Sequence, residues 1–189
     1  MHAKHFVLGA LALAVSAPVL AHDRDEHQAE MKVEKLPRAD VDMIKKLHQA
    51  NREEIELGLV AQQVSMREDV KEFAKMMVDD HRAADEKIVK MGTDHGIPLG
   101  DETDAIKLAD KFRDKGEDFD RDYLGRMVKD HDKVIRLIGT RSNDLKADFQ
   151  AMLNEMLPTL RKHRSEAKLL LDAVKERRPA AARTPRPER

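Results

Sequence analysis

Apolar residues in the middle of the chain recur in steps of three and four, the spacing of one face of an α-helix. One stripe, between residues 67 and 95, consists of Val70, Ala74, Met77, His81, Ala84, Ile88 and Met91. A second, between residues 117 and 141, consists of Leu124, Met127, His131, Val134 and Ile138. A third, between residues 144 and 176, consists of Phe149, Leu153, Met156, Leu160, His163, Ala167, Leu170 and Val174. Each stripe predicts a long amphipathic helix.

Two further helices complete the predicted fold. A long helix is expected over residues 40–65, and a shorter one over residues 102–115 after the stop signal of Gly96 and Pro98. The inward stripe of the first helix is less regular and consists of Ile44, Leu47, Asn51, Glu54, Gly58 and Ala61. Long helices with short links pack antiparallel, so we predict an all-α four-helix bundle with a short extra helix between the second and third long helices. Pro158 is expected to kink the last helix.

The first 21 residues have the organisation of a secretory signal peptide. Lys4 precedes an apolar run over residues 6–17, and Val19 and Ala21 provide the small residues that suit cleavage after Ala21. The run is shorter than the roughly 20 apolar residues that a membrane-spanning helix needs. We therefore expect a periplasmic or secreted protein with no stable membrane span after cleavage.

Charged segments flank the predicted bundle domain of residues 39–177. Residues 22–38 are rich in both acids and bases, which predicts a flexible leader. Residues 178–189 contain three prolines and four arginines, which predict a disordered tail.

The composition excludes several classes of function. The chain has 35 Lys and Arg against 36 Asp and Glu, so no net positive charge suggests a nucleic-acid partner. Aromatic residues make up 3% of the chain, which does not favour an enzyme pocket lined by aromatic rings. The absence of Cys excludes disulfides, thiolate metal sites and a Cys nucleophile.

Each long helix has one candidate metal ligand on its inward stripe. The four residues are Glu54, His81, His131 and His163. Three imidazoles and a carboxylate suit a divalent transition metal such as Zn, Fe, Mn or Cu, and the sequence does not choose among these. No catalytic residue and no site for an organic cofactor is assigned.

Residue counts give a first estimate of how these ligands align. Counting from the first turn places Glu54 and His81 at one height along the bundle. Counting from the link at Ser142-Asn143 separates His163 from His131 by about 12 Å, at 1.5 Å per residue. His163 is then expected nearer to a second polar cluster.

Three residues are candidates for the second shell, the groups that orient ligands. Asp80 precedes His81 and could orient a neighbouring imidazole. Asp120 and Tyr123 match the height that the count gives for His163. Both side chains could then hydrogen-bond to His163 and orient its ring.

Several interpretations of the histidine layer stay open. The layer could hold one transition-metal ion, or it could only fix helix register through hydrogen bonds in a non-catalytic structural or interaction module. A redox enzyme with a degenerate dinuclear site is a third interpretation. The sequence does not specify an envelope protein partner or an oligomeric state.

Five motifs follow one another in order along the chain. They are Asn51-Arg-Glu-Glu54-Ile-Glu-Leu-Gly58, Phe73-Ala-x-x-Met77-Val-x-Asp80-His81, Phe119-Asp120-x-x-Tyr123, His131, and Leu157-Pro158-Thr-Leu160-x-x-His163. Together they resemble the exported domain-of-unknown-function 4142 family, which is grouped with ferritin-like bundles, over about residues 38–173. The resemblance implies a ferritin-like up-and-down fold and an envelope location, with no settled activity. It also places all seven candidate residues on motif positions.

The chain departs from the catalytic ferritin-like pattern. Di-iron members supply a Glu-x-x-His pair from each of two helices. The predicted long helices contain no such pair, and His163-Arg-Ser-Glu166 has the reverse order. We therefore predict an exported, envelope- or stress-related bundle rather than an oxidase.

Overall fold

The computed structural model describes residues 35–101, 103–141 and 145–177. The predicted signal peptide, most of the predicted leader and the predicted tail lie outside the described residues, as does the link at Ser142-Asn143.

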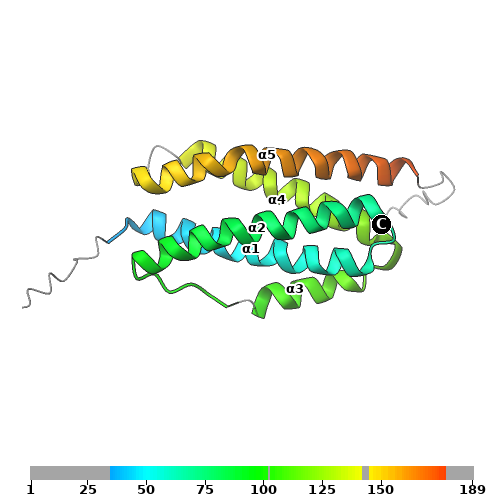
Figure 1. Cartoon of the computed structure of the whole chain (residues 1–189), viewed down its shortest axis with the longest axis horizontal. Helices are drawn as coiled ribbons and strands as arrows, with labels where there is room; N and C mark the ends of the chain where they lie inside the picture. Colours follow the sequence, from blue (N-terminus) through cyan, green and yellow to red (C-terminus); the bar gives the residue numbers. More distant parts are fainter. Residues whose placement is uncertain (1–34, 102, 142–144, 178–189) are drawn as a thin grey trace, which may run out of the picture. The chain divides into compact units, whose positions relative to one another are not determined.

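The described part of the chain is all-α, as predicted. It contains α1 (Arg38–Val64), α2 (Glu68–Asp94), α3 (Thr103–Arg113), a 3₁₀ turn η1 (Gly116–Asp118), α4 (Phe119–Arg141) and α5 (Ala147–Glu176) (Figure 1). Every predicted helix is present, with its ends within three residues of the expected positions. Within the described ranges, no helix is both long and apolar enough to cross a membrane.

Local sequence signals explain where these helices end. Gly96 follows α2 with a φ of +63°, a left-handed conformation that glycine adopts without steric cost. Its N–H donates to the carbonyl of Thr93 at 3.0 Å, and the N–H of Ile97 donates to the carbonyl of Gly92 at 2.8 Å. These bonds satisfy carbonyls in the last turn of α2 and close the helix.

The starts of α1 and α5 are tied together by a buried acid. Asp40 lies in the first turn of α1, and its Oδ2 accepts the backbone N–H of Lys146, the N-cap of α5, at 3.0 Å. α5 then continues without a break through Pro158, which lies on an exposed face.

The long helices associate chiefly in two pairs. α1 packs along α2, α4 packs along α5, and α3 lies against α1, while contacts between the two pairs are sparser (Figure 1). Gly58 permits the close approach of α1 to α2, since a Cβ there would lie 2.7 Å from Val78 Cγ2 and 3.1 Å from the carbonyl oxygen of Ala74.

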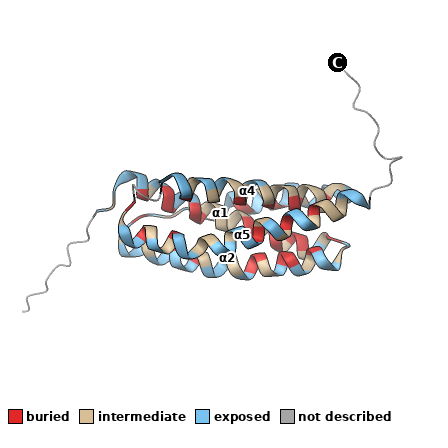
Figure 2. Cartoon of the chain, turned by 90° about the horizontal axis from the view of Figure 1, so that it is seen from above, coloured by how far each residue is buried: buried red, intermediate tan, exposed pale blue. Residues whose placement is uncertain are grey.

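Buried residues recur along the long helices (Figure 2), and the apolar ones form two clusters. The Phe73 cluster consists of Leu57, Val60, Ala61, Val70, Phe73, Ala74, Met77, Ala109, Phe119, Tyr123, Leu124, Met127, Ala167 and Leu171. The Phe149 cluster consists of Met43, Ile44, Leu47, Ile88, Ile97, Ile138, Leu145, Phe149 and Leu153. The residues between these clusters along each long helix include the candidate metal ligands.

Candidate metal centre

Four buried polar side chains, one from each long helix, form a layer between the two apolar clusters. Glu54 of α1 is 4% exposed, His81 of α2 is 5% exposed, and His131 of α4 and His163 of α5 are each 1% exposed. Burial of this kind is costly for polar groups unless they find partners. The contacts of each side chain therefore decide what the layer can do.

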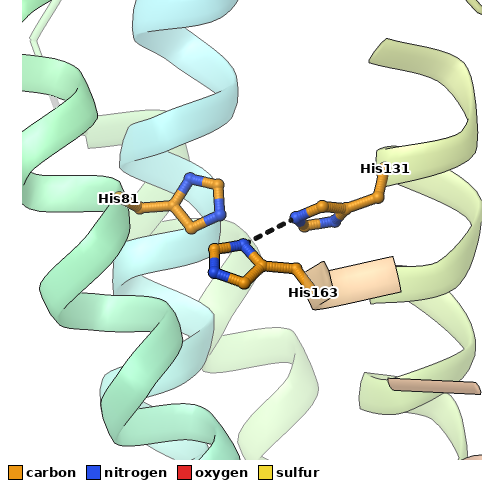
Figure 3. Close-up of side chains that lie close together, drawn as sticks. All are labelled: His81, His131 and His163. Carbon is orange, nitrogen blue, oxygen red and sulfur yellow. Dashed lines mark hydrogen bonds between the residues drawn. The ribbon is translucent and has the colours of Figure 1, made fainter. Parts of the chain in front are cut away.

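The three imidazoles converge on one point. One nitrogen from each of His81, His131 and His163 lies within 4.8 Å of the other two. Figure 3 shows the three rings directed toward one another from α2, α4 and α5. Nε2 of His131 and Nδ1 of His163 lie 3.2 Å apart.

Counting residues from the helix links predicted the relative height correctly for Glu54 and His81 and wrongly for His131 and His163. Glu54 Oε2 lies 2.7 Å from His81 Nε2, at one height as expected. The expected 12 Å offset of His163 is contradicted by its contact with His131. His131 lies ten residues before the end of α4 and His163 sixteen after the start of α5. The two helix ends that flank residues 142–146 therefore differ in height by about 9 Å, which the count had ignored.

The outward nitrogen of each imidazole is hydrogen-bonded to an oxygen. His131 Nδ1 pairs with the carbonyl oxygen of Met127 at 2.9 Å, and His163 Nε2 pairs with Asp80 Oδ2 at 2.8 Å. A carbonyl or a carboxylate can only accept, so in both cases the imidazole N–H donates. Asp80 thus contacts the imidazole of His163, a ring on a different helix.

His81 is oriented in the same way by an amide. Its Nδ1 lies 3.0 Å from Asn51 Oδ1, while Asn51 Nδ2 donates to Asp85 Oδ1 at 3.4 Å. The amide nitrogen is committed to Asp85, so the amide oxygen accepts from His81. In a neutral ring, Nε2 of His81 then carries a lone pair.

This assignment leaves three bare nitrogens facing inward. With the outward nitrogens donating, His81 Nε2, His131 Nε2 and His163 Nδ1 each present a lone pair in the neutral ring. Metal-binding histidines have this arrangement, because the outward hydrogen bond fixes the tautomer and the orientation of the ring. A tetrahedral ion with bonds of about 2.0–2.1 Å would place its nitrogens about 3.3–3.4 Å apart, close to the 3.2 Å observed here.

Burial disfavours a shared proton between the two inward nitrogens of His131 and His163. A hydrogen bond between them requires one ring to be an imidazolium. Burial is the main cause that lowers the pKa of His131, and burial likewise lowers the pKa of His163, to about 4. Near neutral pH the pair is therefore uncharged, and its two lone pairs face each other.

Glu54 adds a carboxylate on the side of His81. Its Oε2 and His81 Nε2 lie 2.7 Å apart, yet neither atom makes a hydrogen bond of ordinary geometry. Burial alone would raise the pKa of Glu54, but the imidazolium forms that His81 and His131 take in acid outweigh burial and lower the pKa to about 2. Glu54 is thus ionised at neutral pH, and Oε2 can bind a cation.

A polar network behind His81 was missed in the sequence. Asp85 Oδ1 lies 2.9 Å from His48 Nδ1, and the carbonyl oxygen of Gly100 lies 3.1 Å from His48 Nε2. A neutral His48 ring donates to one of these two oxygens. The available signal was spacing: Asp85 lies four residues after His81, and His48 lies three before Asn51. Both therefore fall on the inward faces of their helices.

Tyr123 and Asp120, the other two residues expected to orient the ligands, make no hydrogen bond with the layer among the described residues. Tyr123 is fully buried in the Phe73 cluster, and its hydroxyl has no hydrogen-bond partner among the described residues. Burial, and next the charge of Glu54, raise the pKa of Tyr123 above its usual range, so the phenol stays protonated. Asp120 likewise has a buried Oδ1 without a partner in the described part of the chain.

A cavity of about 210 Å³ adjoins the histidine layer. The layer forms one end of it, and side chains of all four long helices line the rest. Its far end is lined by Leu47, Ile88, Ile138 and Met156. The site therefore combines clustered metal-ligand atoms with an apolar space beside them.

Comparison with known proteins gives one match. Residues 25–170 match the family model described as a domain of unknown function, DUF4142. No curated protein and no solved structure matches the chain significantly. The matched region includes the whole histidine layer.

Proposed function

The chain belongs to the DUF4142 family, whose function is unknown, and we propose that it binds one divalent transition-metal ion in the polar layer. His81, His131 and His163 are the nitrogen ligands, and Glu54 is the carboxylate ligand. Imidazole and carboxylate ligands suit Zn, Fe, Mn or Cu.

One observation carries the proposal. Nε2 of His131 and Nδ1 of His163 lie 3.2 Å apart while the opposite nitrogen of each ring pairs with an acceptor oxygen. In a buried neutral pair this geometry opposes two lone pairs, and a cation between them turns repulsion into coordination. His81 contributes a third such nitrogen to the same point.

The wider role that we propose is that of an exported, ferritin-like four-helix bundle that works in the cell envelope. The organisation of residues 1–21 supports export, and the two helix pairs that share one polar layer support the bundle. Residues 39–177 are its domain. Metal capture or stress protection, rather than catalysis, fits a centre whose ligands lack the di-iron Glu-x-x-His pairs.

The test is metal content of protein purified without an affinity tag. After loading with Zn²⁺, Mn²⁺, Fe²⁺ or Cu²⁺ in turn and dialysis, the wild type should keep one ion per chain of at least one of these metals. His131→Ala and His163→Ala should lose it. His95→Ala, at the end of α2 and outside the layer, should keep it.

Thermal denaturation separates this proposal from the structural alternative. Metal that binds only the folded chain at about 100 times its Kd stabilises it by about 2.7 kcal/mol, which EDTA should remove. If metal content is substoichiometric, unchanged in the variants, and EDTA leaves the melting temperature unmoved, then the histidine layer only fixes helix register.

A further inference from the structure

The cavity beside the histidine layer is a column about two helical turns long. From each of the four ligand positions, a step of seven residues toward the same end of the helices reaches another lining residue. Those residues are Leu47, Ile88, Ile138 and Met156. Seven residues of helix span about 10 Å, so the layer and this apolar ring close opposite ends of the column.

Small side chains make the space between the two ends. Ala50 of α1 and Ala84 of α2 line the middle of the column, one turn from Glu54 and His81. Neither side chain extends beyond Cβ. A larger residue at either position would fill the column without replacing a metal ligand.

The size and the lining of the column indicate which ligand could fill it, apart from the group that faces the histidine layer. An apolar cavity of about 150 Å³ is known to hold benzene, so about 210 Å³ accommodates a slightly larger body. Val134 and Leu160 line the middle of the column and offer no hydrogen bonds from their side chains, and the amide of Asn51, which also lines it, is engaged by His81 and Asp85. The matching body is apolar, with about six to eight heavy atoms.

The column can be reached between α2 and α5. Lys87 and Glu155 line it there, and their side chains are 57% and 69% exposed. Their charged groups lie 3.7 Å apart. An exposed ion pair of this kind contributes little free energy, so it offers little resistance to entry.

The charge of the layer defines the head group. A divalent cation with three neutral imidazoles and the carboxylate of Glu54 has a net charge of +1. Asp80 is 40% exposed, and water therefore screens its charge. A buried net charge is costly unless it is paired, so an anion at the end of the column is favoured.

We propose that this column binds a small monoanion whose apolar body lies among the four helices and whose carboxylate-type head coordinates the metal as a fifth ligand, beside the three imidazoles and Glu54. The inference rests on the proposed function, because the metal supplies the charge that selects an anion. It adds the chemical class of the ligand: a short-chain or monocyclic carboxylic acid.

The test uses hexanoate and the metal-loaded protein. Calorimetry should show that one hexanoate binds per chain. Its affinity should be about tenfold above that of 1-hexanol, which lacks the negative charge, and about tenfold above that of acetate, which lacks the apolar chain. With Co²⁺ in the site, hexanoate should change the visible absorption of the ion. Metal-free protein should bind hexanoate at least about tenfold more weakly.

Two matched variants separate the column from the metal. Ala84→Leu fills the column and should weaken hexanoate binding about tenfold or more while one metal ion remains bound. Ala151→Leu adds the same atoms at an exposed position of α5 that does not line the column. This variant should leave hexanoate affinity and metal content unchanged.

The outcomes distinguish this inference from the proposed function. If the wild type holds one metal ion but hexanoate does not bind, or binds equally to Ala84→Leu, the ligand proposal alone is overturned. If no metal binds, both proposals fail. If Ala84→Leu loses its metal, Ala50→Leu, on the neighbouring helix α1, replaces it in the same comparison.

Discussion

Nε2 of His131 and Nδ1 of His163 lie 3.2 Å apart, and the other nitrogen of each ring is engaged with an oxygen. A proton between these two nitrogens, which requires one ring to be an imidazolium, would remove the repulsion of their lone pairs. A metal ion bound to both nitrogens would remove it as well. Burial disfavours the first solution because it lowers the pKa of both rings. This relationship connects metal binding, pH dependence and stability in one set of expectations.

Replacing Asp80 with Asn should weaken metal binding about 10- to 100-fold. The Asp80 carboxylate accepts the N–H of His163 Nε2 at 2.8 Å, which keeps the Nδ1 lone pair directed inward. Asn keeps the shape of the side chain but can also present an N–H, which does not select the same tautomer. The measurement is a competition titration against a metal-binding dye.

Asp79→Asn is the control for that prediction. Asp79 precedes Asp80 on α2, but its carboxylate pairs with exposed Lys75. The affinity of this variant should equal that of the wild type. Equal losses in both variants would mean that net charge, and not the orientation of His163, determines the affinity.

Metal-free protein should lose stability as the pH falls from about 6.5 toward 4. Burial is the main cause that lowers the pKa of His163 from 6.5 to about 4, and Asp80 only partly opposes it. Between these values the unfolded chain binds more protons than the folded chain, so acid favours unfolding. At 1.36 kcal/mol per pKa unit, His163 accounts for about 3 kcal/mol across this window.

Urea denaturation at several pH values, with EDTA present, checks this dependence. His163→Gln should flatten the slope between pH 6.5 and 4, because glutamine does not titrate. A slope that is unchanged in this variant would show that His163 is not the group responsible.

Gly58→Ala should destabilise the protein by about 1–3 kcal/mol, the usual cost of an overpacked core. The new Cβ would lie 2.7 Å from Val78 Cγ2 and 3.1 Å from the backbone oxygen of Ala74, so α1 and α2 would have to separate. Chemical denaturation gives the free energy of unfolding.

Gly125→Ala makes the same substitution where there is room. No atom lies within 4 Å of a Cβ at Gly125 of α4. This variant should be more stable by about 0.5–1 kcal/mol, since alanine favours the helix. If Gly58→Ala stabilises the protein as well, the close approach of α1 to α2 does not constrain the fold.

Tyr123→Phe should leave stability unchanged or raised, with metal affinity within about threefold of the wild type. The hydroxyl is buried without a hydrogen-bond partner among the described residues, so its removal breaks no bond. Thermal denaturation and the dye titration measure the two quantities. An affinity loss above about tenfold would instead assign Tyr123 a second-shell role through Glu54.

The helices and the inward positions could be predicted because they depend on local spacing. The stripes that end at Met91, Ile138 and Val174 place their members on one face, and that face is largely buried in the structure. The same spacing identified His81, His131 and His163 as inward-facing. Helix periodicity is a property of neighbouring residues, which the sequence states directly.

The alignment of α5 against α4 could not be predicted in this way. His163 and His131 meet because the ends of their helices lie at different heights, which no periodicity encodes. The contact of His48 with Asp85 was missed for a related reason: it joins different helices, and neither residue interrupts an apolar run. Such contacts depend on how the helices pack, beyond what each helix specifies.

Contacts between the α1–α2 pair and the α4–α5 pair are sparse, so the polar layer between them affects how cooperatively the chain unfolds. An ion held by His81 on one side and by His131 and His163 on the other would cross-link the two pairs in a chain that has no Cys. Unlike a disulfide, which restricts the unfolded chain, it would hold the two pairs together only in the folded chain and could be removed. Removal of the ion should then let the pairs separate as two units before either one unfolds.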